Sequence, residues 1–161
     1  MGIQQSKIEI KEAVAVLGTG KIEGVVVFTQ AEDHVRIKID INKGLGKNHL
    51  HGFHIHETGD LREGCKSCCA HYNPKETSHG GLHDGHAGDL GNIKSDENGK
   101  CKISLKTDKF RVGDILGRSI IIHEDEDDLG LGEFEDSKTT GHSGSRIACS
   151  VIGISKDGIC K

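Results

Sequence analysis

Apolar and polar residues alternate along several short segments of the chain. The clearest segment is 34–41, where Val35, Ile37, Ile39 and Ile41 are separated by polar side chains. This period of two is typical of a β-strand with one buried face. Further alternation and runs of β-branched residues predict additional strands at 7–11, 25–28, 53–56, 101–106, 120–122 and 151–152.

Turn-forming residues separate these segments, and no segment shows a sustained helical period. Glycine, aspartate and asparagine cluster at 18–20, 44–46, 96–99 and 113–114. Seven or eight short strands joined by turns predict an all-β fold, an antiparallel sandwich or barrel. The length of 161 residues fits one domain that spans residues 1–161.

Two long segments interrupt the rhythm of strands and turns. Residues 58–88 and 124–145 are rich in glycine and contain many His, Cys, Asp and Glu side chains. Long loops within a compact domain usually carry function. Because these two loops contain the residue types that bind metals, we interpret both as functional.

Composition and charge argue against nucleic acids and membranes as binding partners. The formal net charge is −4, and aromatic residues make up 3% of the chain, so neither a basic surface nor a set of base-stacking rings is available for nucleic acid. The same charge argues against an anionic membrane, and no apolar run reaches the roughly 20 residues that span a bilayer. Charged residues at Lys7, Glu9 and Lys11 replace a signal-peptide core, so we expect a cytoplasmic protein. A short myristoylation pattern at Gly2 is interpreted as an ordinary chain terminus.

Histidines are concentrated in the middle of the chain. The segment Phe53-His54-Ile55-His56 places two imidazoles on one face of a strand and two apolar side chains on the other. Further candidate ligands follow in and beyond the next loop, at His71, His79, His86, Asp89 and His123. Three imidazoles and a carboxylate suit zinc, and an all-nitrogen set suits copper. The ligand count fits two ions if one imidazole is shared, although spacing alone does not identify the shared residue.

These residues lie in motifs that resemble the copper/zinc superoxide dismutases. The resemblance rests on nine stretches in the family order, at 51–57, 59–60, 64–65, 71–74, 79–81, 88–92, 117–124, 127–130 and 144–153. Similarity extends from about Ala13 to Ile154. The resemblance implies an eight-stranded antiparallel Greek-key β-barrel, an immunoglobulin-like sandwich with two long functional loops. It also implies a homodimer, one copper and one zinc ion per chain, a superoxide anion substrate and loading by a copper chaperone.

The resemblance assigns a role to each candidate residue. It implies copper ligands at His54, His56, His71 and His123, and zinc ligands at His71, His79, His86 and Asp89. The shared residue would then be His71, which would also move a proton during catalysis. Asp127 would join His54 to His79, His51 would brace the backbone near copper, and Arg146 would guide the anion. Cys65 and Cys149 would form a disulfide.

Other histidines and cysteines are given lesser roles. We interpret His34, His49, His83 and His142 as surface residues, Cys101 as part of the core and Cys160 as a free thiol. The Cys65-x-x-Cys68-Cys69 segment could form a thiolate or redox site, but no second thiolate pair accompanies it at the spacing of a zinc finger.

Two departures from the family pattern bear on rate and assembly. Lys138 lies one position earlier than usual in an acidic loop, which predicts weaker steering of the anion and a rate that depends less on salt. Thr58 stands where the family often has a large apolar residue at the dimer contact. Two alternatives to the enzyme are a copper-chaperone domain of the same fold and a zinc-stabilised binding protein.

Overall fold

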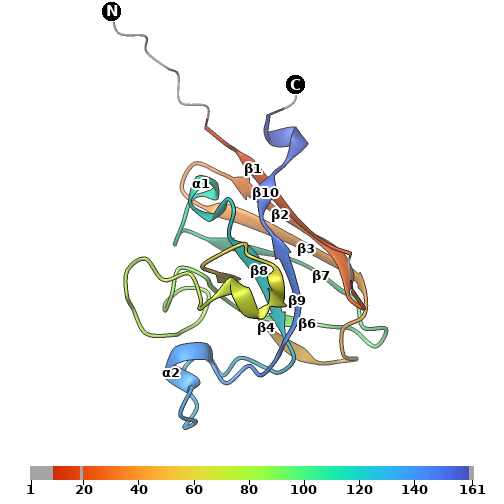
Figure 1. Ribbon diagram of the computed structural model, residues 1–161, viewed down its shortest axis with the longest axis vertical. Coiled ribbons are helices and arrows are strands. Elements are labelled where there is room, and N and C mark those ends of the chain that lie inside the picture. Colours follow the sequence, from red (N-terminus) through yellow and green to blue (C-terminus); the bar gives the residue numbers. More distant parts are fainter. Residues whose placement is uncertain (1–8, 19, 160–161) are drawn as a thin grey trace, which may run out of the picture.

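The computed structural model describes residues 9–18 and 20–159, which form two antiparallel β-sheets packed face to face (Figure 1). The predicted all-β fold is therefore confirmed. Two short α-helices lie outside the sheets, α1 (Val112–Ile115) and α2 (Ser137–Thr140). Among the described residues, no helix has the length and apolar character needed to cross a membrane. The Gly2 pattern and Cys160 lie outside the described residues.

The first sheet has the strand order β10-β1-β2-β3-β7. Its strands are β10 (Gly153–Ile154), β1 (Glu12–Leu17), β2 (Glu23–Gln30), β3 (Val35–Lys43) and β7 (Cys101–Thr107). On β3 the residues Val35, Ile37, Ile39 and Ile41 are buried and the residues between them are more exposed. This pattern confirms the strand with one buried face that the alternation predicted.

The second sheet has the strand order β6-β4-β8-β9. Its strands are β6 (Asp89–Lys94), β4 (Leu50–His56), β8 (Ser119–His123) and β9 (Arg146–Val151). Nearly all residues of β4 and β8 are buried. Their inner faces meet the first sheet, and the histidines on the outer face of β4 are themselves buried. The apolar side chains Phe53, Ile55, Ile120 and Ile122 belong to the common core.

The last strand connects the two sheets. β9 pairs with β8 in the second sheet, and after Ile152 the chain continues as β10, which pairs with β1 in the first (Figure 1). Of the segment predicted as a strand at 151–152, Val151 ends β9 and Ile152 lies between the two strands. β7 returns to lie beside β3 after the chain has passed through the second sheet, which is a Greek-key connection.

One predicted strand is misplaced. Residues 9–11 of the segment predicted at 7–11 are not in a strand, and residues 7 and 8 lie outside the described part. The first strand instead begins at Glu12, where Ala13, Ala15 and Leu17 are buried. β1 is held on both sides, by the next strand β2 and by β10 near the other end of the chain, so its position depends partly on a distant partner.

Both long loops pack against the second sheet. The first follows β4 and contains the short strand β5 (Arg62–Cys65) and the 3₁₀ helix η1 (Lys66–Cys68), whereas the second follows β8 and contains α2. A second 3₁₀ helix, η2 (Lys156–Gly158), follows β10. A disulfide between Cys65 and Cys149 ties the first loop to β9. The other cysteines within the described residues are free, and Cys101 is buried in the core as expected.

Candidate metal centre

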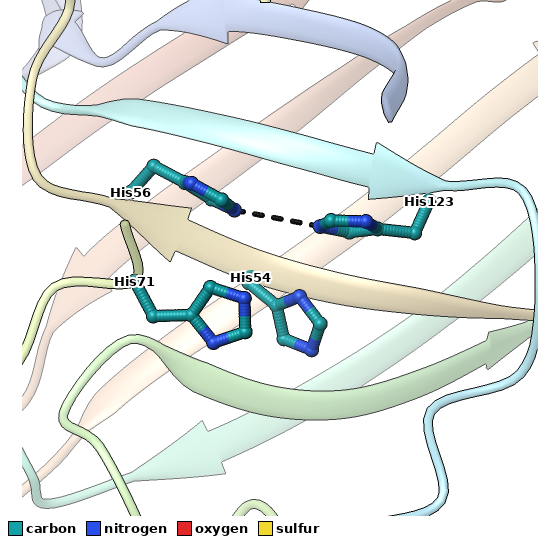
Figure 2. Close-up of side chains that lie close together, drawn as sticks. All are labelled: His54, His56, His71 and His123. Atoms are coloured by element: carbon teal, nitrogen blue, oxygen red, sulfur yellow. Dashed lines mark hydrogen bonds between the residues drawn. The ribbon is translucent and has the colours of Figure 1, made fainter. Parts of the chain in front are cut away.

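Four buried histidines meet on the outer face of the second sheet (Figure 2). His54 and His56 come from β4, His123 comes from the end of β8, and His71 comes from the first long loop, where it forms a β-bridge with His56. β4 and β8 pair directly, so residues separated by more than 60 positions share one surface. One nitrogen from each of the four rings lies within 4.8 Å of the others.

Hydrogen bonds on the outer sides of these rings determine which nitrogens face inward. Nδ1 of His56 donates to the Cys69 carbonyl at 2.9 Å, and Nδ1 of His123 donates to the Gly144 carbonyl at 3.2 Å. Because a carbonyl only accepts, Nε2 of each neutral ring must carry a lone pair. These two Nε2 atoms lie 3.4 Å apart (Figure 2). Two lone pairs at this distance repel unless a cation lies between them.

A second group lies beside the first and includes a carboxylate. It consists of His71, His79, His86 and Asp89, all buried, with ligand atoms again within 4.8 Å of one another. Nδ1 of His71 lies 2.8 Å from Oδ1 of Asp89, and Nδ1 of His86 lies 3.1 Å from the same oxygen. Nδ1 of His79 lies 3.0 Å from Oδ2. A zinc ion with tetrahedral bonds of about 2.0 Å separates its ligand atoms by roughly 3.3 Å, so the group is close to that size.

Unpartnered nitrogens provide an independent test of the fit to metal ions. Five buried nitrogens have no hydrogen-bond partner within residues 9–18 and 20–159. Three of them lie in the two groups, Nδ1 of His54, Nε2 of His71 and Nδ1 of His79, and the other two are Nε2 of His34 and Nε2 of His51. Buried polar atoms without partners are rare in proteins, and the three in the groups are atoms that would bind metals here. The residues present therefore fit a group of two metal ions.

His71 is the residue common to both groups. Its Nδ1 faces Asp89 in the second group, and its unpartnered Nε2 is available to the first. Spacing along the sequence left the shared residue open, and the geometry favours His71.

Asp127, at the start of the second long loop, joins the two groups from behind. Its Oδ2 accepts from Nε2 of His54 at 2.6 Å, and its Oδ1 accepts from Nε2 of His79 at 2.7 Å. Asn92 holds the backbone of Asp127 through two hydrogen bonds of 2.8 and 2.9 Å. Each ring therefore keeps a proton on its outer nitrogen and directs Nδ1 inward, which is how outer partners orient metal ligands.

Burial and neighbouring charges set the protonation of the centre. Burial, with the nearby His71, lowers the pKa of His54 to about 3, and burial is the main reason that the pKa of His123 falls to about 4. Burial opposes the charged form of Asp127, but hydrogen bonds from His54 and His79 outweigh it and lower the pKa to about 2. Burial also opposes the charge on Asp89, whose histidine contacts nevertheless keep its pKa well below its usual range. His54 and His123 are therefore neutral near pH 7 and both carboxylates are ionised. Burial opposes the charged form of His79, but its hydrogen bonds to Asp127 and Asp89 outweigh burial and raise its pKa to about 9, so this ring is protonated before a metal binds.

Comparison with known proteins gives the family. Residues 22–152 match the family model described as copper/zinc superoxide dismutase. The chain belongs to this family. A superoxide dismutase [Cu-Zn] of Paramecium bursaria Chlorella virus 1 is 48% identical over 92% of this chain and 81% of its own length. The crystal structure of the clock protein EA4 superposes with a TM-score of 0.90 at 40% identity, covering 95% of this chain and 100% of the other.

Relatives with other roles and locations also match. The human copper chaperone for superoxide dismutase is 45% identical over 87% of this chain, and the chain spans 52% of the chaperone's length. An extracellular superoxide dismutase [Cu-Zn] of Drosophila melanogaster is 48% identical over 83% of this chain and 77% of its own length. Because one of these relatives is extracellular, the cytoplasmic location of this family member stays a prediction.

Arg146 lies opposite His123 in the pairing of β9 with β8. Its Nη1 donates to the Cys65 carbonyl at 2.7 Å and its Nη2 to the Cys69 carbonyl at 2.6 Å. The Cys69 carbonyl that accepts from Arg146 also accepts from Nδ1 of His56, so Arg146 lies close to that ring as well. The Cys69 carbonyl therefore orients both a candidate copper ligand and the arginine. Sequence reasoning missed this contact, because a backbone carbonyl leaves no mark in residue type.

The remaining candidate residues take structural or surface positions. His51 is buried, and its Nδ1 donates to the His123 carbonyl at 2.8 Å, which fits the bracing role. His34 is partly exposed, whereas His49, His83 and His142 are exposed, and none of the four belongs to either group. Lys138 donates to the Gly130 carbonyl within its own loop.

Proposed function

We propose that the chain is a superoxide dismutase that holds one copper and one zinc ion. The copper ligands would be Nδ1 of His54 and Nε2 of His56, His71 and His123. The zinc ligands would be Nδ1 of His71, His79 and His86, with the carboxylate of Asp89. The observation that carries the proposal is His71, one buried imidazole whose two nitrogens face two different ligand groups.

Copper, when bound, would supply a one-electron couple that turns one superoxide into oxygen and a second into hydrogen peroxide, and zinc would remain redox-inert. The protein contributes proton handling at His71. The only free nitrogen of this ring is Nε2, which is buried and has no partner within the described residues. A proton held there could pass only to a molecule bound inside the site.

Arg146 would bind the anionic substrate. A guanidinium carries five N–H donors, and two of its nitrogens are anchored to the Cys65 and Cys69 carbonyls. The remaining donors have no partner in the part of the chain that the structure describes and could bind a small anion, and the charge is permanent near neutral pH. The anchored geometry holds these donors in place before the anion arrives. Assembly as a homodimer and loading by a copper chaperone complete the proposal.

The first test measures superoxide dismutation and metal content on the same reconstituted sample. We expect activity to follow copper up to one ion per chain. We expect His123→Ala to fold and keep zinc but lose copper-dependent activity. His142→Ala is a matched control, because this exposed loop histidine contacts Asp136 and Phe134 outside the two groups. Full activity in a verified copper-free His123→Ala protein would contradict the assignment.

A copper-delivery role is the second candidate function, favoured by the similarity to several copper chaperones. It predicts a fully loaded protein that is inactive and gives its copper to an apo-dismutase. Measuring copper transfer alongside dismutation separates the two functions. High activity with slow transfer supports the enzyme, and the reverse supports the chaperone.

A further inference from the structure

A lysine ammonium group lies against the back of the segment that contains the second ligand group. Lys109 follows β7 and is partly buried. Its Nζ lies within hydrogen-bond distance of four backbone carbonyls, those of Gly81 at 2.9 Å, Asp84 at 2.9 Å, His86 at 2.8 Å and Asp89 at 2.6 Å. All four carbonyls come from a stretch of nine residues.

This arrangement differs from an ordinary surface lysine. An ammonium has three N–H donors, so four converging carbonyl oxygens surround it as they would surround a small cation. Lys102, on β7 itself, is a useful contrast, because its side chain is 82% exposed and its Nζ lies 3.6 Å from Asp40. Hydrogen bonds to a charged donor are stronger than neutral ones, and four of them on one short segment restrict its backbone.

The four carbonyls belong to the part of the loop that carries the candidate zinc ligands. Two of them are the backbone carbonyls of His86 and Asp89 themselves. Lys109 touches neither of the side-chain atoms that would bind zinc, so it acts from outside the site. It also connects the sheets, since it follows β7 at the edge of the first sheet and reaches the start of β6 at the edge of the second.

We propose that Lys109 is a positioning residue that shapes residues 81–89 for zinc before the metal binds. The inference rests on the zinc site of the proposed function. If the loop is ordered in advance, zinc binding loses less conformational entropy and the affinity is higher. Partners outside the ligand set commonly change metal affinity by about 10- to 100-fold, and we expect a loss of that size without the ammonium.

The experiment compares zinc affinity by chelator competition in the full chain. Lys109→Met keeps most of the side-chain length and removes the donors, Lys109→Arg keeps the charge in a planar group that cannot point at four oxygens, and Lys102→Met is the matched control. Hydrogen exchange of the metal-free proteins reports order in residues 80–89. A further arm adds n-propylammonium to Lys109→Ala, which lacks the same atoms, with tetramethylammonium as a control that cannot donate.

We expect both Lys109→Met and Lys109→Arg to bind zinc more weakly and to exchange faster in the loop, and n-propylammonium to restore part of the affinity of Lys109→Ala. Wild-type affinity in Lys109→Met would overturn the inference while leaving the zinc site intact. Wild-type affinity in Lys109→Arg would also overturn it, because charge alone would suffice. If Lys109→Ala loses its fold and n-propylammonium does not restore it, the lysine stabilises the two-sheet fold as a whole, which would also overturn the inference. Absence of zinc binding by the wild type would overturn the proposed zinc site itself.

Discussion

Replacing Asp127 with asparagine should weaken copper binding more than zinc binding, because the substitution changes one of the two carboxylate oxygens. Oδ1 of Asp127 accepts from both Nε2 of His79 and the backbone N–H of Leu129, each at 2.7 Å. Among the described residues, Oδ2 accepts only from Nε2 of His54, at 2.6 Å. An asparagine has one oxygen and one NH₂ group. Placing the oxygen at the Oδ1 position satisfies two donors, so the NH₂ group should face His54.

The size of the effect follows from that contact. The NH₂ group cannot accept from the Nε2–H of His54, so these two donors would face each other. Alternatively, the NH₂ group would donate to Nε2, and the proton of the ring would move to Nδ1, the atom proposed to bind copper. A hydrogen bond to a charged group contributes about 1.5–3 kcal/mol. At about 1.4 kcal/mol per factor of ten, Asp127→Asn should weaken copper binding by about 10- to 100-fold. Because His79 keeps its acceptor, zinc binding should weaken by less than about tenfold.

Separate competition titrations for copper and zinc provide the assay, with urea unfolding of the metal-free protein to check the fold. Asp128→Asn is the matched control. That carboxylate is adjacent in sequence but accepts from the backbone of Gly130 and from Ser137, and it makes no hydrogen bond to a histidine within residues 9–18 and 20–159. Equal losses for both metals, or a larger loss for zinc, would refute the orientation argued here. Unchanged affinities would refute the role of Asp127 altogether.

Three further predictions concern strain, the shared ligand and charge. Cys69 has φ 62° and ψ −153°, a conformation that strongly favours glycine, so Cys69→Gly should raise the free energy of unfolding by about 1–3 kcal/mol in urea titrations; no gain would contradict the strain. His71→Ala should remove both metals, whereas His86→Ala should spare copper, as metal analysis of the two variants will show. The dismutation rate should change little between low and high salt, because Lys138 is held by its own loop; a steep fall would refute weak steering.

Much of the fold can be read from the sequence where one strand face is buried. The alternation at 34–41 corresponds to β3, and the pair His54 and His56 lies on one face of β4 as the period of two predicted. β1 shows why alternation of apolar and polar residues does not locate every strand. Its buried positions include Ala13 and Ala15, which are too small to produce a strong apolar pattern, and its place depends on pairing with β2 and β10.

The candidate site is predictable in its side chains but not in its backbone contacts. Imidazoles and carboxylates could be picked out by residue type, and the resemblance ordered them into two groups. The Cys69 carbonyl, which accepts from both His56 and Arg146, could not be found in this way, because every residue has a carbonyl. The four backbone carbonyls around Nζ of Lys109 could not be predicted from the sequence for the same reason.

These hidden contacts imply that loop order and metal binding are coupled in this protein. The rings of His54, His56 and His123 come from strands, yet their outer nitrogens are held by Asp127, Cys69 and Gly144, all in the two long loops. The strands therefore bring the rings together, and the loops decide which nitrogen of each ring faces inward. A change that loosens either loop should weaken metal binding even when every ligand is intact. The Cys65–Cys149 disulfide, whose cysteines are 84 residues apart, fixes one of these loops to β9 and so belongs to the same mechanism.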